Sequence, residues 1–285
     1  MSGNHRSDGG HPLADVEQVP GVAKPDPILV VENMRRAFGG LVAVDVDHLE
    51  IQRGIITALI GPNGAGKTTF FNLLTGFDSP DAGSVMFDGK DVQRLNSHRR
   101  AQAGMVRTFQ LTKALTKLSV LENMKLGAKG QVGERFLPSL LPPLWRSQEK
   151  VIEERAHQLL ERFSLHHMAE EYSGTLSGGQ RKLLEMARAL MAAPAVVMLD
   201  EPVAGVNPAL TQSLLEHVKR LPDEGVTVIF VEHDMDVVWD ISDWVVVIAE
   251  GAVIAEGVPE SIGKNRAVID AYLGSGQDVL ESEEV

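Results

Sequence analysis

Cysteine is missing from this chain, aromatic residues are few, and neither an excess of positive charge nor a long apolar run is present. The absence of cysteine from all 285 residues excludes disulfides and cysteine-ligated metal sites, and it fits a reducing compartment. The formal net charge of −12 argues against nucleic acid as the main partner, because binding a phosphate backbone needs a broad cationic surface. No segment approaches the roughly 20 consecutive apolar residues of a membrane-spanning helix. We therefore expect a chain that is soluble by itself and that takes any membrane role through a partner.

The two ends of the chain differ in composition from its middle. Residues 1–27 are rich in Gly, His, Pro and charge and lack the apolar core of a signal peptide, so we expect a flexible N-terminal tail. Residues 275–285 include three glutamates and predict a short acidic C-terminal tail. Between these tails, residues 28–274 form the expected folded domain, and a hydrophobic content of 44% suffices for a substantial core.

A glycine-rich segment follows a short apolar run early in the chain. The run Ile55–Ile60 is β-branched and bounded by glycines, which is typical of a buried strand. The segment after it, Gly61-Pro62-Asn63-Gly64-Ala65-Gly66-Lys67-Thr68, fits the pattern G-x-x-x-x-G-K-[ST] and is called the phosphate loop below. Apolar residues then follow at helical spacing, namely Phe70, Phe71, Leu73 and Leu74. We expect a strand, a tight loop and a helix in succession.

This succession is suited to binding the phosphates of a nucleotide. A helix that begins near Gly66 points its free N–H groups and its positive dipole end at whatever fills the loop, and the glycines let the backbone come close. Lys67 would reach the β- and γ-phosphates, and the Thr68 hydroxyl would ligate Mg²⁺. The alternative is a glycine turn without a ligand.

A second site is expected where the run Val196–Leu199 ends in Asp200 and Glu201. Successive strand residues point to opposite sides, so the two carboxylates should have different roles. At the carboxyl end of a parallel strand, Asp200 can hold Mg²⁺ through its water shell, and Glu201 can polarise a water for attack on the γ-phosphate. Two solvated acids that start a turn before Pro202 are the alternative.

Alternating strand and helix patterns predict an α/β fold. Val44–Ile51 alternates apolar and polar residues like a strand with one exposed face, whereas Ala195–Leu199 and Val226–Val231 are continuous runs suited to buried strands. From about residue 111 to about residue 178 there is little strand signal, so we expect a helical subdomain there. It contains a Pro-rich insert and a helical stretch over Val151–Phe163.

Three further residues, each ambiguous by itself, indicate a nucleotide site only when they are considered together with the motifs above. Gln110 ends a strand-like segment and offers an amide that can touch both Mg²⁺ and water, but alone it is an ordinary loop glutamine. His233 follows the strand Val226–Val231 and can hydrogen-bond a phosphate, although such a histidine is often a simple cap. Phe38 can stack on adenine, but a single Phe before a Gly-Gly turn is more often a packing residue.

A last motif, Leu176-Ser177-Gly178-Gly179-Gln180, is called the signature segment below; taken alone it describes a Ser N-cap with a glycine turn. Together with the phosphate loop, Gln110, Asp200-Glu201 and His233, it stands in the order and rough spacing of the ATP-binding-cassette ATPases, which the chain resembles over about residues 28–274. This resemblance implies a P-loop NTPase (RecA-like) core with an antiparallel β subdomain and an α-helical subdomain. It also implies ATP hydrolysis with Mg²⁺ at the interface of a head-to-tail dimer.

The resemblance also implies residue roles. The catalytic residues are Glu201, His233 and Gln110. The metal ligands are Thr68, Gln110 and Asp200. The residues that bind ATP within the chain are Phe38, Gly61, Pro62, Asn63, Gly64, Ala65, Gly66, Lys67, Thr68 and Thr69. The residues that bind the ATP of the opposite subunit are Ser177, Gly178, Gly179, Gln180 and Asn207.

Five segments narrow the resemblance: Phe38–Leu41, Val106–Gln110, Ala204–Pro208, Val231–Met235 and Ala271–Gly274. They are similar to the larger of the two paired ATPases of branched-chain amino-acid importers. The Pro-rich insert, between about Gly127 and Glu149, is also similar to that subgroup. This similarity implies a second, distinct ATPase, two membrane permease subunits and, indirectly, an extracytoplasmic receptor, with the chain on the cytoplasmic face of the membrane.

Three alternatives remain open at this point. The same machine could import urea, short amides or another small polar solute. A non-transport cassette ATPase would usually show long coiled-coil insertions or two cassettes in tandem, neither of which is present. A nucleotide-binding protein without turnover is disfavoured because both Asp200 and Glu201 are retained.

The chain departs from the wider family at two positions. Phe38 stands where many cassettes have Tyr, and stacking survives because the ring face supplies the contact. Asn207 stands where the family usually has Asp, in a loop that crosses the dimer interface. Asn keeps the hydrogen bonding but lacks the charge, although it resembles the branched-chain subgroup.

Overall fold

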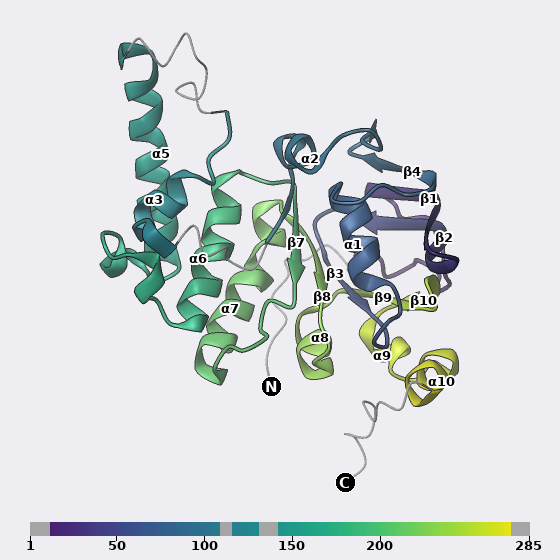
Figure 1. Cartoon of the computed structure of the whole chain (residues 1–285). Helices are drawn as coiled ribbons and strands as arrows, with labels where there is room; N and C mark the ends of the chain where they lie inside the picture. Colours follow the sequence, from purple (N-terminus) through teal and green to yellow (C-terminus); the bar gives the residue numbers. More distant parts are fainter. Residues whose placement is uncertain (1–11, 109–115, 131–141, 275–285) are drawn as a thin grey trace. The chain divides into compact units, whose positions relative to one another are not determined.

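A computed structural model describes residues 12–108, 116–130 and 142–274 (Figure 1). Contacts divide the chain into two compact units. The first unit comprises Met1–Leu74, Asp78–Arg94 and Ser242–Val285, and the second comprises Thr75–Phe77 and Leu95–Ile241. Each unit is described by itself.

An antiparallel sheet of four strands, in the order β2-β1-β4-β5, belongs to the first unit. Its strands are β1 (Pro27–Phe38), β2 (Leu41–Gln52), β4 (Ala82–Phe87) and β5 (Lys90–Asp91). Gly39 and Gly40, with φ of 54° and 92°, join β1 to β2 in a two-residue turn, because a hairpin of this length needs positive φ at both positions. Alternating burial along β2 confirms the predicted strand with one exposed face.

The first unit also carries the strand that leads into the phosphate loop. β3 (Ile56–Ile60) pairs in parallel with β9 (Trp244–Ala249), which pairs antiparallel with β10 (Ala252–Gly257). All residues of β3 and β9 are buried, as the continuous apolar run after Gly54 predicts for β3. The helices of this part are α1 (Lys67–Thr75), α9 (Pro259–Ile262) and α10 (Arg266–Gly274).

Three parallel strands, in the order β8-β7-β6, belong to the second unit. β7 (Val196–Asp200) and β8 (Thr227–Val231) match the predicted strands to within one residue at either end, and β6 (Met105–Arg107) lies in the strand-like segment before Gln110. The helices of this unit are α2 (Ser97–Ala103), α3 (Val120–Lys125), α5 (Pro142–Arg162), α6 (Gly178–Met191), α7 (Pro208–Arg220) and α8 (Met235–Ile241). Short 3-10 helices cover His166–Met168, Ser173–Thr175 and Pro222–Glu224.

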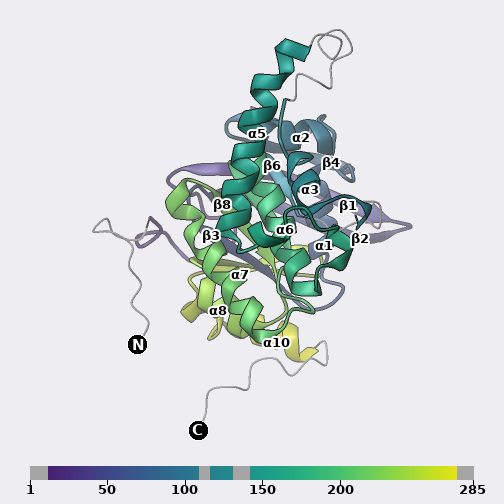
Figure 2. The same cartoon turned by 90° about the vertical axis from the view of Figure 1, so that its left-hand side faces the viewer.

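Helices dominate the described part of the predicted helical region, residues 116–130 and 142–178. α5 packs against both α3 and α6, and α7 lies beside α8 in both views (Figures 1 and 2). The buried side of α6 includes Leu183, Met186, Ala187 and Leu190, which lie at helical spacing. None of the helices in the described ranges is long and apolar enough to cross a membrane.

Residues 12–26 correct one expectation, because they are packed against the first unit rather than forming part of a flexible tail. Leu13 is 1% exposed. The Lys24 ammonium forms a buried ion pair with the Glu256 carboxylate at 2.7 Å, and the same carboxylate accepts a hydrogen bond from the Trp244 indole at 2.9 Å. A polar composition suggested solvation, but the buried partners come from residues more than 200 positions away along the chain. The remaining N-terminal residues and the predicted acidic tail lie outside the described residues.

Candidate functional site

The phosphate loop connects the end of β3 at Ile60 to the start of α1 at Lys67, as predicted. Gly61 and Gly66 have φ of 150° and 100°, and a Cβ on either would overlap a backbone carbonyl, that of Ile248 for Gly61 and that of Ala43 for Gly66. Gly64, with φ of 80°, faces open space. Two of the glycines therefore allow close packing beneath the loop, and the third lies on its open side.

Lys67 is only 6% exposed, and its ammonium is held by the loop itself. Nζ donates to the carbonyl oxygens of Gly61 at 2.6 Å and Pro62 at 2.9 Å. Thr68 is exposed beside it in the first turn of α1. An ammonium, a hydroxyl and the free N–H groups of a helix start are together suited to bind phosphate oxygens.

Contacts from β9, β10 and α10 brace the loop from within the first unit. The Gly251 N–H donates to the Ala65 carbonyl at 3.0 Å, and the Gly251 carbonyl accepts from Asp45 at 2.8 Å. Tyr272 of α10 is 3% exposed, and a hydrogen bond joins its hydroxyl to the Gly61 backbone. Burial raises the pKa of Tyr272 to about 12, while this hydrogen bond acts in the opposite direction. The loop therefore depends on residues far downstream in the sequence.

Phe38 ends β1 with 47% of its surface exposed. The Arg36 guanidinium lies 4.6 Å from the ring centroid, and the carboxylate of Asp78 holds that guanidinium through two hydrogen bonds of 2.9 Å. The ring is therefore accessible for stacking, and one arginine already contacts it.

In the second unit, Asp200 and Glu201 have different partners, as their strand positions predict. β7 ends at Asp200, whose carboxylate pairs with Arg107 of β6 at 2.5 Å. Glu201 has a φ of 46°, and its N–H donates to the Val231 carbonyl at 3.0 Å. This left-handed conformation costs a non-glycine residue on the order of 1–3 kcal/mol and turns the chain sharply away from the strand.

His233 and Glu201, which were predicted separately, lie together. His233 Nε2 is 3.0 Å from Glu201 Oε1, and both side chains are nearly half exposed. Below them, the buried Glu232 accepts hydrogen bonds from the backbone N–H groups of Val203 at 3.1 Å and His233 at 3.2 Å. Desolvation raises the pKa of Glu232, and these two hydrogen bonds counter it. A carboxylate and an imidazole in contact can orient a water and share its proton.

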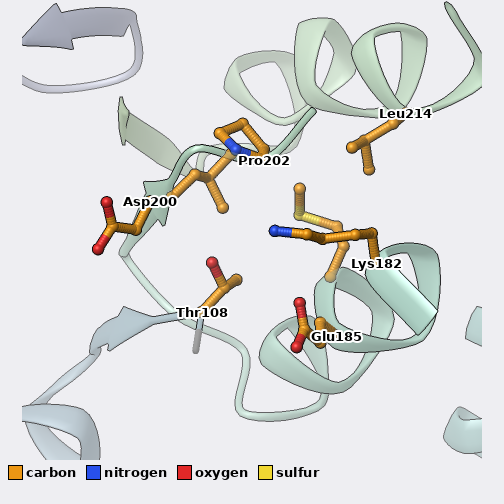
Figure 3. Close-up of a pocket in the computed structure, with 8 residues that line it drawn as sticks. Thr108, Lys182, Glu185, Asp200, Pro202 and Leu214 are labelled. Atoms are coloured by element: carbon orange, nitrogen blue, oxygen red, sulfur yellow. The ribbon is translucent and has the colours of Figure 1, made fainter. Parts of the chain in front are cut away.

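The second unit also contains a water-sized cavity of about 10 Å³, whose lining includes the residues on either side of Glu201 in the sequence (Figure 3). It is lined by residues of β7, α6 and α7 and of the segments that follow β6 and β7, including Thr108, Lys182, Glu185, Asp200, Pro202 and Leu214. The Lys182 ammonium points toward the turn at Pro202 (Figure 3) and donates to the Glu201 carbonyl at 3.2 Å.

The signature segment forms the N-terminus of α6 through a capping box. Ser177 Oγ accepts from the Gln180 N–H at 3.3 Å, and Gln180 Oε1 accepts from the Ser177 N–H at 2.9 Å. Gly178 is exposed, whereas Gly179 is buried where a Cβ would overlap Leu210. Since the Ser177 oxygen accepts in this box, its hydroxyl proton is still available to a ligand.

Asn207 caps α7 and is exposed. Its Oδ1 accepts from the Leu210 N–H at 3.0 Å, and Pro208 occupies the first helical position. An aspartate could make the same cap, so the departure from the wider family changes the charge and leaves the helix start intact.

The phosphate loop and Phe38 belong to the first unit, while Asp200, Glu201, His233, the signature segment and Asn207 belong to the second. Gln110 lies outside the described residues. Sequence reasoning missed Arg107, Lys182, Glu232 and Tyr272 as partners of these groups. In the sequence, these residues are distinguished only by standing next to or within a motif, and that position does not specify which group they contact.

Among the described residues, no three His, Asp or Glu side chains converge to hold a metal ion. Mg²⁺ is commonly bound through one or two carboxylates, waters and substrate phosphates, without an all-protein cage. The oxygen donors predicted as ligands, a hydroxyl and a carboxylate, suit this hard cation.

Comparison with known protein families also indicates an ATP-binding cassette. A family model for "ABC transporter" matches residues 44–204, and a model for "Branched-chain amino acid ATP-binding cassette transporter" matches residues 252–278. The chain is 42% identical to a probable branched-chain amino acid transport ATP-binding protein of Archaeoglobus fulgidus, covering 89% of this chain and 98% of the relative. It is 43% identical to a high-affinity branched-chain amino acid transport ATP-binding protein of Pseudomonas aeruginosa, covering 87% and 98%.

Solved structures of ATP-binding cassettes are similar to the chain in both fold and sequence. The ADP conformation of an ATP-binding cassette of an ABC transporter has a TM-score of 0.75 and 36% identity, covering 87% of this chain and 99% of that one. A nucleotide-free cassette has a TM-score of 0.74 at 36% identity, covering 86% and 98%. These similarities confirm the predicted P-loop NTPase fold. The chain therefore belongs to the ABC transporter family, and it is an ATP-binding cassette that hydrolyses ATP.

Proposed function

We propose that this chain is the ATP-binding subunit of an importer for branched-chain amino acids, that is, leucine, isoleucine and valine. The match of residues 252–278 to the branched-chain cassette model carries the proposal. Its described part comprises β10, α9 and α10, the region that places Tyr272 against the phosphate loop. The relatives named for this transport support it over nearly their whole length.

Within each chain, the phosphate loop binds the β- and γ-phosphates of ATP, and Lys67 leaves the loop carbonyls to contact them. Thr68, Gln110 and Asp200 would hold Mg²⁺, which supplies charge neutralisation of the phosphates. Glu201 takes a proton from the attacking water, and His233 holds the Glu201 carboxylate and the γ-phosphate. The contact of 3.0 Å between these two side chains supports this pairing.

A second ATPase subunit completes each site. Ser177, Gly178 and Gln180 at the exposed start of α6 bind the γ-phosphate of ATP held by the other subunit. Gly179 lets α6 pack closely on its own chain, and Asn207 contributes its amide at the same interface. The spare hydroxyl proton of Ser177 and the dipole of a helix of 14 residues support this role.

We further propose that the chain binds the cytoplasmic face of the membrane through two permease subunits, and that an extracytoplasmic receptor delivers the solute to them. The second unit offers a groove of about 370 Å³, bordered by α2, β6 and α6, for an acidic permease loop. Arg188 and Lys129 line it, and burial lowers the pKa of both. Such partly desolvated cations gain most from an anionic partner.

Reconstitution tests the proposal. The wild-type chain, its permease partners and its receptor are placed in vesicles, and ATP-dependent uptake of leucine, isoleucine and valine is compared with that of urea and short amides. We expect branched-chain uptake that Glu201→Gln abolishes. Uptake of urea or amides alone would show that the transported solute is not a branched-chain amino acid. If purification of the chain from its native membrane recovered neither a permease nor a second ATPase, the transport role would be contradicted.

A further inference from the structure

We propose that Lys182 is a positioning residue that couples the start of α6 to the catalytic carboxylate of the same chain. The proposal rests on the function proposed above, because it assigns α6 and Glu201 to different ATP molecules. Its structural basis lies entirely within the described residues of the second unit.

Glu201 is held from several directions. Its N–H donates to the Val231 carbonyl at 3.0 Å, and its carboxylate contacts His233 at 3.0 Å. Its own carbonyl accepts from Lys182 at 3.2 Å, which is the contact that connects it to α6. With a φ of 46°, the peptide after Glu201 is turned out of the strand, so this carbonyl is available to a side chain.

Lys182 lies little more than one turn into α6, about 7.5 Å along the helix axis from the Ser177 cap. The helix between them is capped and its apolar face is buried, so it moves as a rigid body. A displacement of the Ser177 end on meeting a phosphate therefore also displaces the Lys182 ammonium and the Glu201 carbonyl that it holds.

The surroundings of Lys182 favour a specific contact over a general surface charge. Lys182, Glu185 and Asp200 line the same water-sized cavity (Figure 3), and Glu185 is 6% exposed. The ammonium donates to the Glu201 carbonyl at the edge of this cavity, and this hydrogen bond restricts the orientation of the Lys182 side chain. No residue outside the described part of the chain is needed for this arrangement.

The consequence is communication between the two ATP sites of a dimer. Glu201 acts on the ATP of its own phosphate loop, whereas the start of α6 contacts the ATP of the other subunit. Engagement of α6 by the second ATP then adjusts the carboxylate that serves the first. Lys182 contributes to this coupling without touching either nucleotide.

Lys182→Met tests the proposal by removing the ammonium at similar length. Steady-state ATP hydrolysis is measured on the full chain in complex with its second ATPase subunit, with Lys182→Arg as the conservative variant and Lys219→Met as the control. Lys219 is a partly exposed lysine of the same unit whose ammonium donates to the Asp240 carboxylate at 2.8 Å. We expect Lys182→Met to lower kcat by about 10- to 100-fold, as a displaced catalytic group does, with KM for ATP within about twofold. Lys182→Arg should restore most of kcat, and Lys219→Met should match the wild type.

A double variant separates positioning from structure. If Lys182 acts through Glu201, adding Lys182→Met to Glu201→Gln lowers the residual hydrolysis no further. An equal loss in both backgrounds, an unchanged kcat in Lys182→Met, or unfolding of that variant would overturn the proposal. Since the test compares hydrolysis rates, it stands even if the transported solute proves to be another one. A wild-type complex of the two ATPase subunits without ATP hydrolysis would instead contradict the proposed function.

Discussion

Single residues of the candidate site are held mainly by backbone groups. The Lys67 ammonium rests on two loop carbonyls, Glu232 accepts from two backbone N–H groups, and Lys182 donates to a carbonyl. Backbone partners do not change with side-chain substitution, so the effect of each variant is confined to the group that is removed. This makes the site suitable for tests at single positions.

Lys67→Ala should weaken ATP binding by about 10- to 100-fold, since a hydrogen bond to a charged group contributes about 1.5–3 kcal/mol. Isothermal titration with ATP measures the affinity. Lys90→Ala, at an exposed lysine of the same unit, is the control and should bind as the wild type does. Unchanged affinity in Lys67→Ala would contradict the assignment of the phosphate loop.

Tyr272→Phe should lower the free energy of unfolding by about 1 kcal/mol, because it removes a buried hydroxyl that bonds the Gly61 backbone. ATP affinity should fall with it, since Gly61 begins the phosphate loop. Urea unfolding and nucleotide titration measure the two effects. The chain has one other tyrosine, Tyr172, which is 63% exposed, and Tyr172→Phe should change neither quantity.

At the scale of elements, β10 and the segment 12–26 depend on one buried ion pair. The Lys24 and Glu256 side chains are 1% and 0% exposed. Lys24→Met leaves the Glu256 carboxylate without its cation and should destabilise the chain by about 3 kcal/mol, the lower end for a broken buried pair. Val22 and Trp244 still donate to this carboxylate, which limits the loss.

The double variant Lys24→Met with Glu256→Gln should recover part of that loss, because it removes the unpaired charge while the amide oxygen still accepts from one of the two donors. Urea unfolding of both variants is compared with Lys219→Met, which breaks a surface ion pair and should cost at most about 1 kcal/mol. If Lys24→Met were no more costly than this control, the packed N-terminal segment would contribute little to the fold.

His217 of α7 makes the second unit sensitive to acid. Its ring stacks on Phe163 at 4.2 Å, and its Nδ1 has no hydrogen-bond partner among the described residues. Burial lowers the pKa of His217 below its ordinary value of 6.5, helped by the charges of Arg162 and Arg220 and opposed by Glu216 and Glu224. Above pH 6.5 both states hold a neutral ring; below it the unfolded state takes up the proton first, so stability falls as the pH falls.

His217→Gln should therefore lose less stability than the wild type between pH 7.5 and pH 5.5, by urea unfolding at both pH values. His98→Gln, at an exposed histidine, serves as the control. An equal loss in wild type and His217→Gln would show that other groups account for the acid sensitivity.

At the scale of the whole molecule, we propose that the phosphate loop and the signature segment of one chain each supply part of a different ATP site. Glu201→Gln keeps the hydrogen-bonding shape of the side chain but removes the base. We expect this variant to bind ATP and to accumulate as an ATP-bound closed pair of subunits, with hydrolysis reduced by at least about 100-fold. Sedimentation with its partner ATPase, with and without ATP, measures the pair.

Near-normal turnover in Glu201→Gln would remove Glu201 from its catalytic role. Absence of ATP-dependent pairing would contradict the assignment of Ser177 and Gly178 to the opposite nucleotide. These two outcomes are independent, so the catalytic role of Glu201 and the role of the signature segment at the opposite nucleotide are tested separately.

Local patterns predicted the strand before the phosphate loop and the helix start at the signature segment, because each depends on residues a few positions apart. Asp200 and Glu201 were predicted to point to opposite sides of the strand end, and their side chains contact different partners, Arg107 and His233. Residues 12–26 were wrongly predicted to belong to a flexible tail. Their polar composition indicates only that such residues are usually solvated, and it cannot identify a buried partner elsewhere in the chain.

The sequence by itself determined the family, the nucleotide chemistry and the order of the motifs, because backbone-level motifs need only particular residues at short fixed spacing. Only the tertiary structure decided which distant residues contact each other: Tyr272 bonds the Gly61 backbone, Lys182 donates to the Glu201 carbonyl, and Lys24 pairs with Glu256. These contacts join residues 19 to more than 200 positions apart, and at such separations many partners are chemically equivalent until the packing of strands and helices selects one.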